Sequence, residues 1–415
     1  MRKLAIILGF CLLGSMLTSC ALPIVVSNYV DSMGNEEDRK KIEYTDEAKK
    51  SGFTLEKPAT GAVAGKDEFL IQGSLAESKA GDVLSVWVSK DGLSGKKPVT
   101  IMDKKFQDTI PLYYGKGQHQ VEIMIEKNGV HVTVAKFTVD KTSDVEQTPV
   151  KYSGSYQTNG ITLHQPLTGG KSYDGKVLLQ GTVVPPSKDE KPLKYMIVHA
   201  EKGEDTSRYY LPVENQKFSQ WIPLRFGAGD YKVSIWLDEM TDYLTPVADF
   251  NVKNTVTADL RDLLPGSGME SDNPELIALS KKITANASSP MEKARAIYKH
   301  VATNVSYDLK KKDNYWDDGA LKTLRERKGI CHDYALTTVA LLRASEIPAR
   351  YISGDAGEPH AWVEAKIGGK WIPMDPTWGS GYSTGKKFVK AYDPSYFNPN
   401  PASFKKTHKK PEVEY

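Results

Sequence analysis

The sequence predicts a multidomain fold in which two similar all-β units stand in tandem before a mixed α+β domain. Three observations support this fold class. Residues 52–140 and 160–254 repeat the same motifs and alternate in hydrophobicity with period two between glycine-containing turns. From residue 255 onward apolar residues recur at helical spacing, and a period-two segment returns from residue 360. A length of 415 residues agrees with two or three domains.

Composition excludes several classes of function. The formal net charge of +3 is too small to indicate a nucleic-acid partner, and the apolar content of 40% is enough for hydrophobic cores. The sequence contains no zinc-ligand spacing, phosphate-binding loop or dinucleotide-binding fingerprint. We therefore predict no metal and no cofactor.

Residues 1–20 are predicted to be a targeting segment that is not part of the fold. Two basic residues precede the apolar run 4–17, which is too short to span a membrane comfortably. The run ends in LTSC, which resembles a bacterial lipoprotein signal and implies cleavage before Cys20 and a diacylglycerol on its thiol. The alternative is an ordinary secretory signal that ends near the same place. We expect a lipid-anchored protein on the extracytoplasmic face of the cell membrane.

Two further expectations concern the beginning of the chain. Cys11 would leave with the signal and Cys20 would carry lipid, so Cys331 would be the one free thiol of an exported protein. Residues 21–50 are dense in charge and lack turn signals. We interpret them as a solvated tether in preference to a short helix.

Residues 51–141 and 152–254 are predicted to be two copies of one β-sandwich of immunoglobulin-like type. The segment GFTLEKP in the first copy matches GITLHQP in the second, and IPLYYGKG matches IPLRFGAG. The dipeptides Asp-Gly at 91–92 and Asn-Gly at 128–129 are two-residue hairpin signals.

These units are expected to act as spacers or as ligand-binding modules. Tyr209, Tyr210 and Trp221 would form a carbohydrate-binding platform if all three were exposed. Aromatic residues in sandwiches belong mostly to the core, however. The order of the strands does not follow from the sequence.

Residues 255–415 are predicted to form one α+β domain that begins with helices. Asn-Pro at 273–274 places a capping residue before a proline at the first helical position, and Ser-Pro-Met-Glu at 289–292 is a capping-box pattern. A short helix over 320–327 then leads the chain toward Cys331.

Cys331 is the first candidate functional residue. Apolar residues at helical spacing follow it without glycine or proline until Pro348, so it falls in the first turn of a buried helix. A helix N-terminus favours a thiolate, which is the nucleophilic form of cysteine. Taken alone, a cysteine in a helix is more often a small buried hydrophobic residue.

His360 and Asp375 are brought together by a predicted hairpin. The residues after His360 alternate, and Gly-Gly at 368–369 is a two-residue turn signal, so that Val363 pairs with Met374. This register makes one face apolar throughout and places Asp375 on the same face as His360, diagonal to it. Each residue alone has an ordinary structural interpretation. Together with the cysteine they match a nucleophile, a base and the residue that orients the base.

Three segments of this region resemble the transglutaminase-like superfamily, which shares the papain-type catalytic core. They are GICHDYA, IPARYISGD and HAWVEAKIGGKWIPMDPTWG, and they occur in order and with fitting spacing over about the last third of the chain. The resemblance implies Cys331 as nucleophile, His360 as general base and acid, and Asp375 as the residue that orients His360. The animal cross-linking enzymes carry tryptophan directly after the cysteine, whereas this chain has His332, which is more similar to the bacterial hydrolase-like branch.

We therefore expect an exported, cysteine-dependent enzyme that hydrolyses or transfers an amide or peptide bond through a thioester. The expected partners are a protein or peptide substrate, with cell-wall peptide as one option, and the membrane through the lipid anchor. The sequence does not decide between hydrolysis and transfer. The rival interpretations are an inactive scaffold that keeps the fold and a lipoprotein that binds cell wall or protein.

Other residues near the candidate site give weaker signals. The backbone N–H of Cys331 and the indole N–H of Trp316 are the candidate oxyanion donors, although Trp316 also fits a core or rim position. His332 and Asp333 point apart on a helix and so do not indicate a metal. His408 stands in the run KKTHKKP, which we expect to be a solvated basic end.

Overall fold

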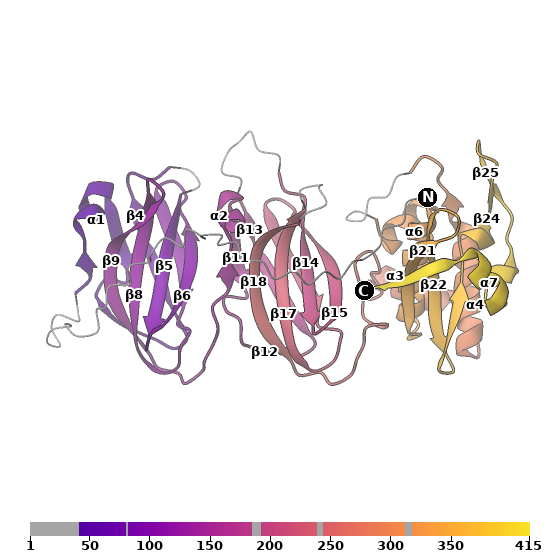
Figure 1. Cartoon of the computed structure of the whole chain (residues 1–415), viewed down its shortest axis with the longest axis horizontal. Helices are drawn as coiled ribbons and strands as arrows, with labels where there is room; N and C mark the ends of the chain where they lie inside the picture. The colour runs from indigo at the N-terminus through magenta and orange to yellow at the C-terminus, as the bar shows by residue number, and fades with distance from the viewer. Residues whose placement is uncertain (1–40, 80–81, 185–191, 239–243, 312–317) are drawn as a thin grey trace, which may run out of the picture.

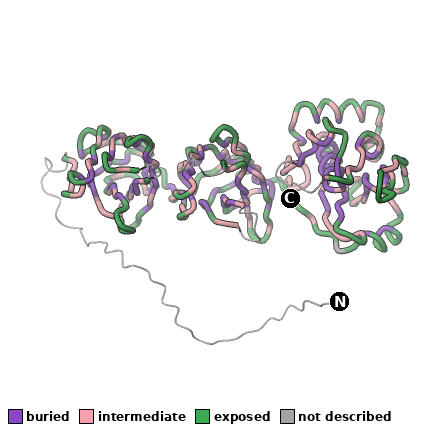
Figure 2. Tube along the Cα trace, turned by 90° about the horizontal axis from the view of Figure 1, so that it is seen from above, coloured by how far each residue is buried: buried purple, intermediate pink, exposed green. Residues whose placement is uncertain are grey.

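Three bodies follow one another along the long axis of the molecule (Figure 1). The computed structural model describes residues 41–415 except for 80–81, 185–191, 239–243 and 312–317. Two bodies consist mainly of strands, and the third carries most of the helices, so the chain is mostly β-sheet. Figure 2 shows buried residues gathered inside each body, and each has its own hydrophobic core. Within the described ranges, no helix is long and apolar enough to cross a membrane.

The first body packs two sheets around one core. Its elements are β1 (Glu43–Tyr44), α1 (Asp46–Ser51), β2 (Phe53–Lys57), β3 (Ala62–Gly65), β4 (Glu68–Leu75), β5 (Val83–Lys90), β6 (Leu93–Thr100), β7 (Lys105–Pro111), β8 (Gly117–Lys127) and β9 (Val130–Lys141). One sheet has the order β1-β9-β8-β5-β6 with β3 beside β9, and the other has the order β2-β4-β7. Ile71 of β4 and Val86 of β5 are fully buried in the shared core.

The second body repeats this arrangement. Its elements are β10 (Lys151–Tyr152), α2 (Gly154–Thr158), β11 (Ile161–Gln165), β12 (Ser172–Tyr173), β13 (Lys176–Val183), β14 (Tyr195–Lys202), β15 (Asp205–Pro212), β16 (Lys217–Pro223), β17 (Gly229–Asp238) and β18 (Leu244–Asn254). The sheets have the orders β10-β18-β17-β14-β15, with β12 beside β18, and β11-β13-β16. The sequence repeat therefore corresponds to one strand order used twice, while the immunoglobulin-like type stays a prediction.

Two hairpins of the first body form where the dipeptide signals predict them. Lys90 pairs with Leu93, and Lys127 pairs with Val130, so each turn has two residues. Both residues of each turn have positive φ, with values between 52° and 79°. This conformation matches the right-handed twist of the strands and explains the Asp-Gly and Asn-Gly dipeptides.

Part of the predicted tether is folded against the first body. Strand β1 pairs with β9, and α1 follows it with Thr45 as its N-cap. Ala48 is only 2% exposed and belongs to the core of this body. The charged residues of this segment obscured a short amphipathic helix, because only a few apolar positions face the sheet.

The third body combines helices with a four-stranded sheet. The helices are α3 (Pro274–Ile283), α4 (Pro290–Asn304), α5 (Ala320–Glu326), α6 (Cys331–Ala344) and α7 (Pro401–Thr407), and the short strands are β19 (Ser306–Tyr307), β20 (Lys328–Gly329), β24 (Gly381–Ser383) and β25 (Phe388–Lys390). The sheet has the order β23-β22-β21-β26, formed by β21 (Ala349–Asp355), β22 (Pro359–Ile367), β23 (Lys370–Met374) and β26 (Lys409–Glu414). Helix α6 is buried along its length between α3, α4 and α5 and the strands β21 and β22.

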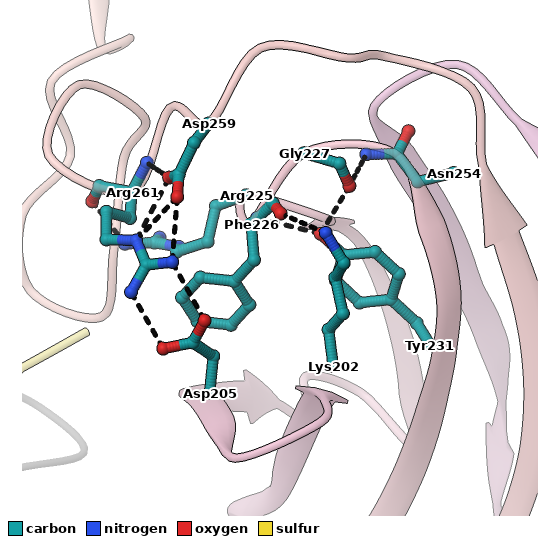
Figure 3. Close-up of polar contacts among 9 residues, drawn as sticks. All are labelled: Lys202, Asp205, Arg225, Phe226, Gly227, Tyr231, Asn254, Asp259 and Arg261. Carbon is teal, nitrogen blue, oxygen red and sulfur yellow. Dashed lines mark hydrogen bonds and ion pairs between the residues drawn. The ribbon is translucent and has the colours of Figure 1, made fainter.

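An arginine cluster joins the second body to the chain that leads into the third (Figure 3). Arg225 is fully buried and donates to the Tyr209 hydroxyl at 2.8 Å and to the backbone carbonyls of Arg261 and Pro265. Arg261 makes two hydrogen bonds, of 2.7 and 2.8 Å, to the carboxylate of Asp205. The connection is therefore held by one buried arginine and one partly exposed arginine, each with specific acceptors.

The condition for an aromatic platform on the second body is not met, because Tyr209, Tyr210 and Trp221 are not all exposed. Tyr209 is 2% exposed and packs in the core, whereas Trp221 is 51% exposed. The two side chains therefore do not share one open surface. Alternation along β15 places Tyr209 inward, where its hydroxyl is satisfied by Arg225.

The Arg225→Met variant is expected to lower the free energy of unfolding by about 3 kcal/mol, because it leaves the Tyr209 hydroxyl and two carbonyls without their donor. Urea unfolding of the whole chain measures this change. Arg208→Met is the matched control, because that arginine is exposed and its loss should change stability by less than about 0.5 kcal/mol. Equal stability of the two variants would contradict the role of Arg225.

Candidate active site

The first turn of α6 is fixed by a buried carboxylate. Asp333 is fully buried, and its Oδ2 accepts the backbone N–H of Ile330 at 2.7 Å. Its Oδ1 accepts from Nζ of Lys311 at 2.6 Å, and the same Nζ lies 2.5 Å from Oδ1 of Asp318. A carboxylate in the first turn satisfies an unpaired N–H and complements the helix dipole. Cys331, the first residue of the helix, is thereby held in place while its side chain stays partly exposed.

The β22–β23 hairpin has the register that the sequence predicts. Val363 pairs with Met374, and Ile367 pairs with Lys370. The connecting Gly368 and Gly369 have φ values of 58° and 78°, as a two-residue hairpin turn requires. In this register His360 lies near the start of β22, and Asp375 follows the last residue of β23 directly.

The structure brings His360, Asp375 and Cys331 together. Nε2 of His360 lies 2.9 Å from Oδ2 of Asp375. The Cys331 thiol lies close enough to His360 to affect the pKa of the ring, and because Nε2 faces Asp375, Nδ1 is the nitrogen that is left for the thiol. Burial disfavours a charged ring, but the interactions with Asp375 and Cys331 outweigh it and raise the pKa of His360 to about 10. The imidazolium form is therefore favoured at neutral pH.

Asp375 is held by donors on both carboxylate oxygens. Oδ1 accepts the backbone N–H groups of Thr377 at 2.9 Å and Trp378 at 3.0 Å. The side chain is fully buried, which raises its pKa, but hydrogen bonds from His360 and His408 hold the pKa below its usual range. Asp375 therefore stays ionised and orients the ring of His360.

His408 was expected in a solvated basic end, and this expectation is wrong. The residue is 4% exposed, and its Nε2 lies 3.2 Å from Oδ2 of Asp375. It follows α7, which begins at Pro401 with Asn400 as N-cap, and the next residues form β26 against β21. The Asn-Pro capping signal, together with Phe404 and His408 four residues apart on one helix face, was the sequence signal for this burial.

Two predicted site residues lie outside the described residues. These are Trp316, the candidate oxyanion donor, and Cys20, the candidate lipidation site. His332, next to the cysteine, is buried, and its Nδ1 lies 2.9 Å from the hydroxyl of Tyr351. It therefore takes part in packing behind the nucleophile.

Among the described residues, one group of side chains has the composition of a metal site. The ligand atoms of His360, Asp375 and His408 all lie within 4.8 Å of one another. The oxygen and the two ring nitrogens already join in hydrogen bonds with each other. We therefore assign this group to orienting His360 and derive no metal chemistry from it.

Comparison with known proteins identifies the family of this region. A sequence model of the transglutaminase-like superfamily matches residues 277–376, which include Cys331, His360 and Asp375. Residues 277–376 belong to the transglutaminase-like superfamily. The chain is 31% identical over 148 residues to mouse kyphoscoliosis peptidase, an alignment that covers 31% of this chain and 22% of that protein. An uncharacterized Mycobacterium leprae protein, ML0607, is 40% identical over 70 residues, covering 14% of this chain and 25% of that protein. The chain thus spans about a quarter or less of the length of these relatives.

Solved structures give weaker likenesses. The periplasmic domain of TgpA from Pseudomonas aeruginosa is 16% identical and covers 72% of this chain and 88% of its own, with a TM-score of 0.24. Red sea bream transglutaminase is 12% identical and covers 54% of this chain and 50% of its own, with a TM-score of 0.22. Scores at this level do not establish a shared overall fold.

Proposed function

We propose that the chain is a cysteine-dependent hydrolase or acyl transferase that acts on amide or peptide bonds. The observation that carries this proposal is the hydrogen bond between Asp375 and His360, with Cys331 at the start of α6 close enough to His360 to affect the pKa of its ring. The match of residues 277–376 to the transglutaminase-like superfamily supports the same chemistry. The retention of all three side chains in one cluster disfavours the inactive-scaffold interpretation.

The first half of the reaction uses His360 as an acid. The Cys331 thiolate attacks the carbonyl carbon of the substrate, and a C–S bond forms while the carbonyl oxygen becomes negative. The backbone N–H of Cys331 is the first donor to that oxygen, and we propose the indole of Trp316 as the second. The C–N bond then breaks, and Nδ1–H of the imidazolium gives its proton to the leaving amine. The products are a thioester and the free amine.

The second half uses His360 as a base. Water or a second amine attacks the thioester carbonyl, and Nδ1 of His360 takes its proton as the C–S bond breaks. The products are a carboxylic acid or a new amide, together with the regenerated thiolate–imidazolium pair. Asp375 keeps Nε2 protonated throughout, so that Nδ1 is always the nitrogen that exchanges protons with the reaction.

The first two bodies complete the proposal. We infer that they are immunoglobulin-like spacers that hold the transglutaminase-like domain away from a membrane to which Cys20 is anchored by lipid. The hydrogen bonds that the side chains of Arg225 and Arg261 make at the connection after the second body favour a spacer of fixed orientation over a flexible linker. The substrate is a protein or peptide, and cell-wall peptide fits an enzyme on the outer face of the membrane.

The pH dependence of Cys331 alkylation tests the proposed pair. In protein lacking residues 1–20, Cys331 is the only cysteine, so iodoacetate reports on this thiol alone. Because the pKa of His360 is raised to about 10, the imidazolium persists through neutral pH and attracts the anionic reagent. We expect a rate that is high and flat from mildly acidic pH upward and that falls as pH passes through about 10.

The His360→Ala variant is the control for this profile. Without the imidazolium, alkylation should follow an ordinary thiol titration near pH ~8.5. The same profile in both proteins would overturn the proposed pair and favour the scaffold interpretation.

A further inference from the structure

We propose that His408 is a positioning residue that holds the Asp375 carboxylate toward His360. This inference rests on the proposed function, because it concerns the same Cys331 pair. Nε2 of His408 lies 3.2 Å from the carboxylate oxygen that Nε2 of His360 approaches at 2.9 Å. The two rings meet edge to face with their centroids 5.7 Å apart, so they approach Oδ2 from different directions.

The carboxylate of Asp375 has a complete set of donors. Thr377 and Trp378 donate backbone N–H groups to Oδ1, and the two histidines donate to Oδ2. A fully buried carboxylate needs such donors, because each one that is missing leaves charge unsolvated in the protein interior. His408 therefore supplies one of four contacts that fix the plane of the group.

The hydrogen-bond pattern defines the role of the His408 ring. Its Nε2 faces a carboxylate, which only accepts, so Nε2 must carry hydrogen. Its Nδ1 lies 2.9 Å from Oγ1 of Thr407, which can accept from or donate to that nitrogen. His408 therefore donates to Asp375 whether the ring is neutral or protonated, and the inference does not depend on its charge.

The surroundings prevent the His408 ring from turning. The ring stacks on Phe404 with centroids 3.7 Å apart and planes 12° apart, and it contacts the rings of Trp362 and Trp378 at 5.0 and 4.8 Å. Its side chain is 1% exposed. A histidine held by aromatic rings and by partners on both nitrogens is a fixed donor.

The backbone on either side also fixes this ring. Residue 409 begins β26, and Lys409 pairs with Asp355 at the end of β21, next to the point where Gly354 pairs with His360. A Cβ on Gly354 would collide with the Trp362 ring and lie 2.7 Å from the Lys409 carbonyl oxygen. The lack of a side chain at Gly354 thus allows the segment carrying His408 to approach the strand carrying His360.

Two substitutions of His408 separate the effect of its N–H donor from the effect of its aromatic ring. His408→Phe keeps an aromatic ring against Phe404 but removes the donor to Asp375, whereas His408→Gln keeps an N–H donor near the Nε2 position. The readout is the rate of Cys331 alkylation by iodoacetate at pH 6, where wild-type reactivity depends on an aligned thiolate–imidazolium pair. We expect a loss of about tenfold in His408→Phe and recovery to within about threefold of wild type in His408→Gln. Thermal unfolding is measured on the same samples.

Each outcome decides the inference. Equal rates in wild type and His408→Phe, with fast wild-type alkylation, would overturn the role of His408 and leave the proposed function intact. If both variants lose alkylation rate equally and both unfold at a lower temperature, His408 contributes packing alone. This result also overturns the donor role. An ordinary thiol profile in the wild type itself would overturn the proposed function and this inference together.

Discussion

The Cys331→Ala variant is expected to reduce amide cleavage and transfer by a factor on the order of 10⁵ or more, to the background rate. The described part of the chain contains no other cysteine, and neither His360 nor Asp375 is free to form the acyl intermediate, because each is held by the other. Cys331 is only partly buried, so losing one sulfur atom should change stability by less than about 1 kcal/mol.

Casein is a suitable general acyl donor for this test. Release of acid-soluble peptide measures hydrolysis, and incorporation of a fluorescent primary amine measures transfer, so the two outcomes of the thioester are separated. Cys331→Ser is the second variant, because it keeps a hydroxyl that is a far weaker nucleophile in the same position. Activity of Cys331→Ala equal to that of the wild type would remove the thioester mechanism.

The sequence predicts much of the site because the decisive signals are local. The two glycines at 368–369 determine a two-residue turn, and this turn determines the register that brings His360 and Asp375 to one face. The apolar run after Cys331 determines the buried helix. In each case the relation between residues is set by a strand or helix period and does not depend on distant parts of the chain.

The contribution of His408 could not be predicted in the same way. It depends on the pairing of β26 with β21, which are more than fifty residues apart in sequence. The hydrophobic period of a strand does not specify the strand with which it pairs. The neighbouring lysines led to the prediction that the segment is solvated, although burial of Phe404 and His408 alone is enough to pack it against the domain. The partner of Tyr209 could not be predicted for a related reason, because Arg225, which donates to its hydroxyl, lies in the loop after β16.

Asp375→Asn is expected to lower turnover by about 10²–10⁴-fold with the fold kept. The substitution conserves shape but replaces a group that only accepts hydrogen bonds with one that accepts at one end and donates at the other. The N–H groups of Thr377 and Trp378 lie 2.9 and 3.0 Å from Oδ1 and can only donate. The amide oxygen must therefore take the Oδ1 position, and the amide nitrogen must take the Oδ2 position.

An amide nitrogen at that position points at Nε2 of His360 and forces it to accept. The proton of the neutral ring then moves to Nδ1, which faces Cys331, so the ring can no longer take the thiol proton. Casein turnover and iodoacetate alkylation at pH 6 should both fall, and wild-type rates would exclude Asp375 from the mechanism. Asp375→Ala is the informative comparison, because it removes the partner of His360 without imposing a tautomer. A rate in Asp375→Asn below that in Asp375→Ala, despite the conserved shape, would show that Asp375 acts by selecting the proton position on His360.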